Sequence, residues 1–146
     1  MAPKVIYEKG KGEGLKELER KLISELMKNS RRSDKELAKA IFSTRLDLTH
    51  PLCFGYGREI VPVFKSTVSV AKKDPNIYNN PVVYTDDPLL SGYCTDENRD
   101  RIKGAPFASV HGTRIISLYD NTNFRAIWYG TNKIFLNAVF FGQIIR

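Results

Sequence analysis

The chain has 146 residues, 42% of them hydrophobic and 27% charged, a balance that is typical of one globular domain and argues against disorder or a membrane span. Its net charge of +7 can indicate an anionic partner such as nucleic acid. However, much of the basic excess lies before Ala40, interleaved with acidic residues, and no RNA-reading motif, zinc-finger spacing or basic zipper is present. We therefore expect no nucleic-acid partner.

The first part of the sequence predicts a lead-in and two helices. Residues 1–14 are rich in glycine and lysine and lack the apolar core of a secretion signal, so we expect a flexible lead-in. Leucines recur at helical spacing over 14–28, which predicts an amphipathic helix. Ser33, with a glutamate three residues later, is typical of a capping box that opens a short helix over 35–40. We expect a single domain over 15–146.

From Ile41 the pattern changes to short β-prone stretches separated by turns. These stretches are IFSTRLD, IVPVFKSTVSV, PVVYT, PFASVH and TRIISLYD. Pro62 interrupts the second stretch, so that strand should lie at a sheet edge or bend. The last two stretches, joined across His111 and Gly112, predict a β-hairpin or two neighbouring strands. The run RIISLY is apolar on both faces, which predicts a strand covered by helices on each side.

The segment 123–142 closes the chain with apolar residues almost all round a helix. This pattern predicts a buried helix. We expect Trp128, Phe135 and Val139 to close the core.

The turn before this helix offers the main candidate binding site, because α/β proteins often bind ligands where a strand leads into a helix. The candidate residues for a peptide or small anion are Asn121, Asn123, Arg125 and Tyr129. They would hold the ligand at the helix N-terminus. The competing structural interpretation, which we favour, has Thr122 or Asn123 capping the helix and Asp120 pairing with Arg125.

A nucleophile is hard to place in this sequence. His50 and Cys53 lie three residues apart in THPLCFGYG, and a thiol beside an imidazole can be activated. However, Pro51 disfavours a helix that would stack the two side chains, and no third orienting group is identifiable. We favour a turn with a packed cysteine and a hydrogen-bonding histidine. Cys53 and Cys94 fit no metal or redox spacing, and they either pair or remain thiols.

Metal sites are equally weakly indicated. His50 and His111 are the two histidines, and neither belongs to a zinc-peptidase signature. The acidic pair Asp86 and Asp87 and the segment TDENRDR lack the spacing of a calcium loop. We interpret them as turn and helix-start residues.

Four stretches together resemble the C-terminal region of large multidomain zinc carboxypeptidase-like proteins of Bacteroidetes. They are LDLTHPLCFGYG, LLSGY, IKGAPFASV and RIISLYDNTNFRAIWYGTNKIFLNAVFFG, all within 46–142, and the last is the most specific. The resemblance implies a class I glutamine amidotransferase-like, flavodoxin-type α/β fold, that is, a layered sheet with flanking helices that follows a peptidase domain.

The resemblance also places the chemistry outside this chain. The family's zinc ligands and catalytic glutamate belong to the upstream peptidase domain, and the amidotransferase nucleophile elbow has no match here. It therefore implies no catalytic residue, metal or cofactor in this chain, zinc in the parent's peptidase domain, and a periplasmic or extracellular location.

One departure from the family pattern matters. Before Leu46 the sequence offers one faint strand and two helices, so we expect it to begin inside the domain, with a sheet that a neighbour covers or dimerisation completes. We expect a non-catalytic accessory domain that packs on the peptidase domain or shapes access to it. A peptide- or anion-binding module is the alternative.

Overall fold

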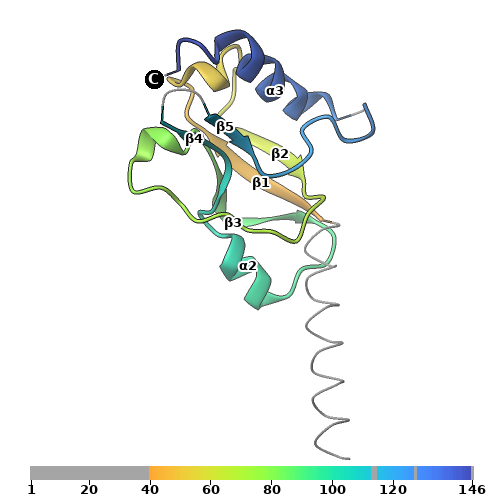
Figure 1. Ribbon diagram of the computed structural model, residues 1–146. Helices are drawn as coiled ribbons and strands as arrows, with labels where there is room; N and C mark the ends of the chain where they lie inside the picture. The colour runs from red at the N-terminus through yellow and green to blue at the C-terminus, as the bar shows by residue number, and fades with distance from the viewer. Residues whose placement is uncertain (1–39, 113–114, 127, 146) are drawn as a thin grey trace, which may run out of the picture. The chain divides into compact units, whose positions relative to one another are not determined.

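The computed structural model describes residues 40–112, 115–126 and 128–145 (Figure 1). In chain order the elements are β1 (Ile41–Leu46), the 3-10 turn η1 (Pro51–Cys53), β2 (Ile60–Phe64), the 3-10 turn η2 (Ile77–Asn79), β3 (Val82–Ser91), α2 (Asp96–Ile102), β4 (Pro106–His111), β5 (Ile115–Leu118), the 3-10 turn η3 (Phe124–Ala126) and α3 (Tyr129–Phe141). Both helices expected before residue 40, and the domain start expected at residue 15, lie outside the described residues.

The described strands form one curled sheet in the order β2-β1-β3-β4-β5 (Figure 1). Every pairing between them is antiparallel. Register shifts interrupt the pairing of β3 with both of its neighbours, and such irregularities bend and twist a strand locally. The α/β class is therefore confirmed, whereas an antiparallel sheet is not typical of the flavodoxin-type fold.

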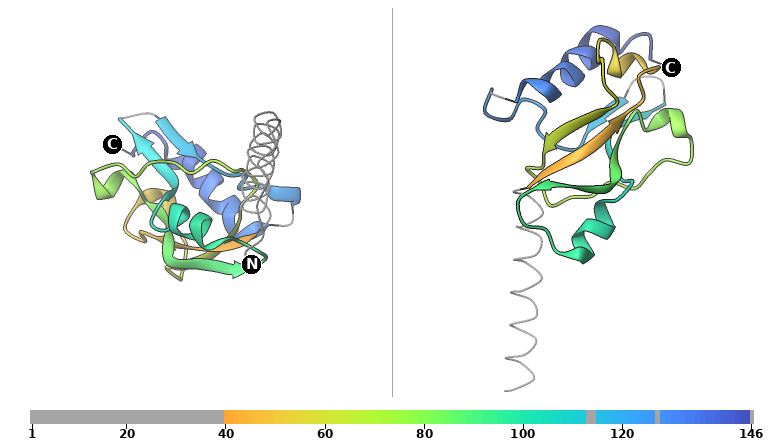
Figure 2. Two further views of the ribbon diagram at one scale, coloured as in Figure 1. Left: turned by 90° about the horizontal axis from the view of Figure 1, so that it is seen from below. Right: turned by 180° about the vertical axis from the view of Figure 1, so that it is seen from behind.

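The two helices lie on opposite sides of the sheet (Figure 2). α2 packs against β3, and α3 packs against β2 and η1. α2 begins where the acidic segment predicted a helix start, because the Thr95 side chain accepts a hydrogen bond from the Asn98 backbone N–H. Asp86 and Asp87, expected in a turn, instead lie exposed on β3.

The β4–β5 hairpin is confirmed, and His111 pairs with Ile115 at its end. Gly112 has a φ of +60° at the turn, a conformation that glycine adopts without a steric penalty. The prediction that helices cover both faces of this last strand is wrong. β5 is an edge strand, Ile115 is 61% exposed, and the other β5 residues are only half-buried.

Pro62 lies in β2, the other edge strand, as we predicted from its missing backbone N–H. Two hydrogen bonds show which way the residues on either side of it face. The Leu46 backbone N–H donates to the Glu59 carbonyl oxygen, and the Lys65 backbone N–H donates to the Ala40 carbonyl oxygen. Because alternate residues of a strand point their N–H groups in opposite directions, position 62 faces away from β1. A missing N–H there costs no ladder hydrogen bond. The strand ends at Phe64, shorter than the β-prone stretch suggested.

Three aromatic rings form the centre of the core. Tyr84 packs edge-on against Phe42 and Phe107, with ring centroids 5.9 and 6.1 Å apart, in the geometry that aromatic quadrupoles favour. All three side chains are at most 3% exposed. The other apolar residues of the core with 0% exposure are Leu52, Val63, Val82, Ile102, Ala108 and Ile134.

Candidate functional site

The predicted ligand-binding residues are exposed on the β5–α3 connection and the first turn of α3. Asn121 Oδ1 accepts the Asn123 backbone N–H at 2.9 Å, so that side chain already serves the turn. The Arg125 guanidinium lies 5.2 Å from the centroid of the Phe124 ring. Tyr129 is 76% exposed. The structure thus places the four residues in one exposed segment.

The backbone of this segment departs from the expected helix start. α3 begins at Tyr129, and the Trp128 position before it makes no side-chain cap hydrogen bond, so capping by Thr122 or Asn123 is wrong. Arg125 and Ala126 both have a φ of +53°, a left-handed conformation that costs energy in residues with a Cβ atom.

Asp120 is paired with Lys65 and not with the exposed Arg125 that we expected. Lys65 Nζ lies 2.9 Å from Asp120 Oδ2, and the two side chains are 1% and 0% exposed. The Ser66 and Thr67 backbone N–H groups donate to Oδ1 at 2.8 and 2.9 Å. The Tyr84 hydroxyl lies 3.2 Å from Oδ2. We call these five residues the Asp120 clamp.

The Asp120 clamp joins the two opposite edges of the sheet. Lys65 directly follows β2 and Asp120 lies two residues after β5, and these are the outermost strands. Burial, then the charge of Asp120 and the hydrogen bond to it, raise the pKa of Tyr84 well above its usual value, so its hydroxyl stays neutral as a donor. Because the carboxylate and ammonium are buried with their hydrogen bonds satisfied, we assign the clamp a structural role.

The sequence held a signal for Lys65 that we did not use. Val61 and Val63 alternate along β2, Lys65 continues the alternation directly after its end, and all three are buried. A strand with period-2 alternation points such residues to one face. A lysine that continues an inward alternation requires a buried acceptor, but sequence alone does not name Asp120.

The His50–Cys53 turn has the structural role that we favoured, with a hydrogen-bonding histidine and a packed cysteine. His50 Nδ1 accepts the Leu52 backbone N–H at 3.1 Å and caps η1, while Cys53 Sγ lies 3.5 Å from the Pro81 carbonyl oxygen. Burial, then the charge of Asp47, raise the pKa of Cys53 to about 12, so a thiolate is strongly disfavoured at neutral pH.

His50 itself is buried and neutral. Burial lowers its pKa below the usual 6.5, although the charge of Asp47 opposes this. Its Nε2 has no hydrogen-bond partner within the described part of the chain, and its ring packs 4.5 Å from that of Tyr78. Cys53 and Cys94 are both buried and are not joined in a disulfide, which answers the question about their pairing.

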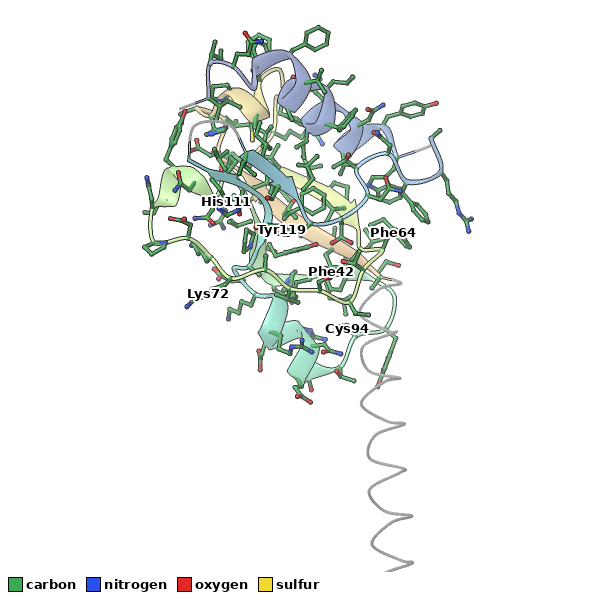
Figure 3. The ribbon with its side chains drawn as sticks, viewed as in Figure 1. Phe42, Phe64, Lys72, Cys94, His111 and Tyr119 are labelled. Carbon is green, nitrogen blue, oxygen red and sulfur yellow. The ribbon has the colours of Figure 1, made fainter. Side chains whose placement is uncertain are left out.

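His111 is positioned by the hairpin. Its Nε2 lies 3.2 Å from the Tyr119 hydroxyl (Figure 3).

Among the residues that the structure describes, no three His, Cys, Asp or Glu side chains gather to hold a metal ion. Across the same described ranges, no helix has the length and apolar character needed to span a bilayer. The expected absence of a metal from the chain stays a prediction.

The most unusual surface belongs to α3, because polar residues lie on its buried side and apolar residues that we expected to be buried are exposed. Its buried residues are Thr131, Ile134 and Asn137, two of them polar. Asn137 Nδ2 donates at 2.9 Å to the carbonyl oxygens of both Leu52 and Phe54. Thr131 Oγ1 donates to the Thr122 carbonyl oxygen at 2.6 Å. These hydrogen bonds fix which side of the helix faces the sheet.

Several apolar residues of α3 are instead exposed on the opposite side of the helix. We call the outward set Tyr129, Leu136, Val139 and Phe140 the α3 ridge; their exposed fractions are 76, 45, 65 and 76%. The prediction of a buried closing helix is wrong, since Val139 is in the ridge and Phe135 is 39% exposed. Trp128 is half-buried, and its indole N–H donates to the Pro62 carbonyl oxygen at 3.3 Å.

An open hollow of about 480 Å³ lies beside the start of α3. Its lining residues are Gly55, Tyr56, Gly57, Arg58, Ile60, Val61, Pro62 and Gly130. The Lys133 side chain contacts two of these lining residues. Its Nζ lies 2.7 Å from the Gly55 carbonyl oxygen and 5.4 Å from the centroid of the Tyr56 ring. The Tyr56 hydroxyl donates to the Gly130 carbonyl oxygen. None of the four predicted ligand-binding residues lines this hollow.

No protein-family model, curated protein or solved structure matches this chain.

Proposed function

We propose that this chain is a non-catalytic accessory domain of a zinc metallocarboxypeptidase-like protein, and that the α3 ridge is where it packs on the peptidase domain. The observation that carries the proposal is the orientation of α3. Its polar residues Thr131 and Asn137 are buried and hydrogen-bonded, while Val139 and Phe140 are exposed. Contiguous apolar side chains of this kind on a folded surface mark interaction sites.

The apolar area supports a domain interface. At about 200 Å² per aromatic side chain, the ridge residues Tyr129 and Phe140, each 76% exposed, contribute on the order of 300 Å². Covering that area is worth roughly 7 kcal/mol before the costs of association. Two domains of one polypeptide pay less for lost translational freedom than free molecules do.

The remaining parts of the proposal come from the resemblance alone. They are the amidotransferase-like fold of the complete family domain, zinc in the upstream peptidase domain, and a periplasmic or extracellular location. The antiparallel sheet is not typical of that fold, so the proposal rests on the α3 ridge.

The test mixes this chain with the separately produced peptidase domain of the same polypeptide and measures the Kd by calorimetry. Val139→Ser and Phe140→Ser remove exposed ridge side chains without opening a core cavity, and each should weaken association at least about tenfold. Tyr93→Ser is the matched control, since Tyr93 is 66% exposed between β3 and α2, and it should leave the Kd unchanged. If the two domains do not associate, or if the three variants behave alike, the proposed function is wrong.

A second candidate function, the peptide- or anion-binding module, is favoured by one observation. Arg125 and Ala126 both adopt a left-handed conformation within the exposed segment that carries Asn121 and Asn123, and such strain concentrates at functional loops. A bound carboxylate would raise the melting temperature, and Arg125→Ala would remove the rise. A screen of short peptides and carboxylates that gives no shift at millimolar concentration would rule this candidate out.

A further inference from the structure

The two ends of α3 have different chemistry. Leu136, Val139 and Phe140 form the C-terminal part of the α3 ridge, and Ile144 beyond it is 64% exposed. Around the N-terminal end lie three exposed cationic residues that we call the basic end: Arg58, Arg125 and Lys133. Arg58 belongs there because it lines the hollow shared with Gly130.

The charge of the basic end is poorly compensated. Asp120 is the one acidic residue of the sequence from Lys103 to Arg146, and its carboxylate is buried in the Asp120 clamp. Glu59 is the one acidic neighbour that follows Arg58 in the chain. The first turn of α3 has no side-chain cap, so its N–H groups add to the positive potential.

We infer that the surface receiving α3 is an apolar groove of a folded protein domain that carries carboxylates opposite Arg58, Arg125 and Lys133. This inference rests on the proposed function and specifies the chemistry of the partner. A helix of this length presents a ridge about 20 Å long, so an apolar floor and an acidic end fit along one groove. The charges fix the direction in which α3 lies there, because reversal would put carboxylates against Val139 and Phe140.

A second copy of this chain fits the same surface less well. A two-fold axis that pairs two antiparallel α3 helices would place each basic end against the apolar end of its mate, which leaves the cationic residues unneutralised. A lipid surface fits less well because a basic helix in a membrane interface carries its cations along the polar face. Here the cationic residues gather at one end.

The experiment measures the Kd between this chain and the peptidase domain at about 50 and 300 mM salt, with charge-reversal variants. We expect Arg58→Glu to weaken association roughly tenfold at low salt and much less at high salt. Lys103→Glu is the matched control, because Lys103 is an exposed cation at the end of α2, on the other side of the sheet from α3. It should change the Kd less than about twofold. Circular dichroism verifies that both variants fold.

The outcomes separate this inference from the proposed function. Association that Phe140→Ser weakens but that Arg58→Glu and salt leave unchanged overturns the acidic groove and keeps the docking surface. Absence of association removes both. Dimerisation of the chain alone in sedimentation, lost in Phe140→Ser, overturns the inference in favour of a second copy. Binding to phosphatidylserine vesicles that Arg58→Glu abolishes overturns it in favour of an anionic membrane.

Discussion

Removal of the Asp120 carboxylate should be the most damaging single change among the polar residues described. Asp120→Ala leaves the Lys65 ammonium, 1% exposed, without its countercharge. It also leaves the Ser66 and Thr67 backbone N–H groups, which lie 2.8 and 2.9 Å from Oδ1, without their acceptor. Breaking a buried ion pair costs about 3–5 kcal/mol. We expect a loss at the upper end of that range, because unpaired buried donors cost more.

The opposite deletion should cost less, which makes the reasoning testable. In Lys65→Met the carboxylate of Asp120 still accepts from Ser66, Thr67 and the Tyr84 hydroxyl. The methionine side chain also fills most of the space of the lysine stem. We expect a loss of roughly 1–3 kcal/mol. Asp87→Ala, at an exposed position on β3, is the control and should stay within about 0.5 kcal/mol.

Urea unfolding followed by circular dichroism measures these losses as shifts of the midpoint at constant slope. If Asp120→Ala does not fold, Asp120→Asn replaces it, since the amide oxygen still accepts the two backbone N–H groups while the countercharge is lost. A loss below about 1 kcal/mol for removal of the Asp120 charge, or a larger loss in Lys65→Met, would refute the account of the clamp as a buried hub centred on Asp120.

Three further predictions concern the turn at His50 and the two faces of α3. Because Cys53 is buried with a pKa of about 12, alkylation at pH 8 should be far slower in the native chain than in urea, and rapid native labelling would contradict its packing. Because the pKa of His50 is lowered from 6.5, the unfolded chain binds the proton more readily, so the free energy of unfolding should fall as the pH drops below about 6.5. His50→Asn keeps an acceptor for the Leu52 N–H and should flatten that slope in urea titrations, whereas an unchanged slope would assign it to other groups. Finally, Ile134→Ala should cost about 2–5 kcal/mol as a core truncation, and Phe140→Ser should change stability by less than about 0.5 kcal/mol; equal losses in thermal melts would show that α3 is oriented differently.

Local patterns predicted the local elements well. The alternation in IFSTRLD became β1, the turn at Gly112 joined β4 to β5, and the acidic segment after Thr95 became α2. Pro62 reached an edge strand because its missing N–H is tolerated there. The favoured interpretation of His50 as a hydrogen-bonding turn residue also agrees with the structure, since its Nδ1 accepts within two residues along the chain.

The candidate site was less predictable because its contacts span long sequence separations. Lys65 and Asp120 are 55 residues apart, and no pattern around Asp120 distinguishes a distant lysine from the nearby Arg125. The exposure of the four predicted binding residues depends on a strained loop backbone, and no glycine in the loop signals that strain in the sequence. These residues are Asn121, Asn123, Arg125 and Tyr129. Asp120 and Arg125, which we expected to pair, therefore lie in different environments, one buried and the other exposed.

The sequence by itself indicated approximately where the described strands, the β4–β5 turn and α2 begin, because hydrophobic period, proline chemistry and capping act over a few residues. Only the tertiary structure decided which face of α3 is buried and which partner Asp120 takes. A helix that is apolar almost all round has no preferred side in its own pattern. The choice fell to Asn137 and Thr131, whose hydrogen bonds to carbonyl oxygens exist only once η1 and the β5–α3 connection are in place.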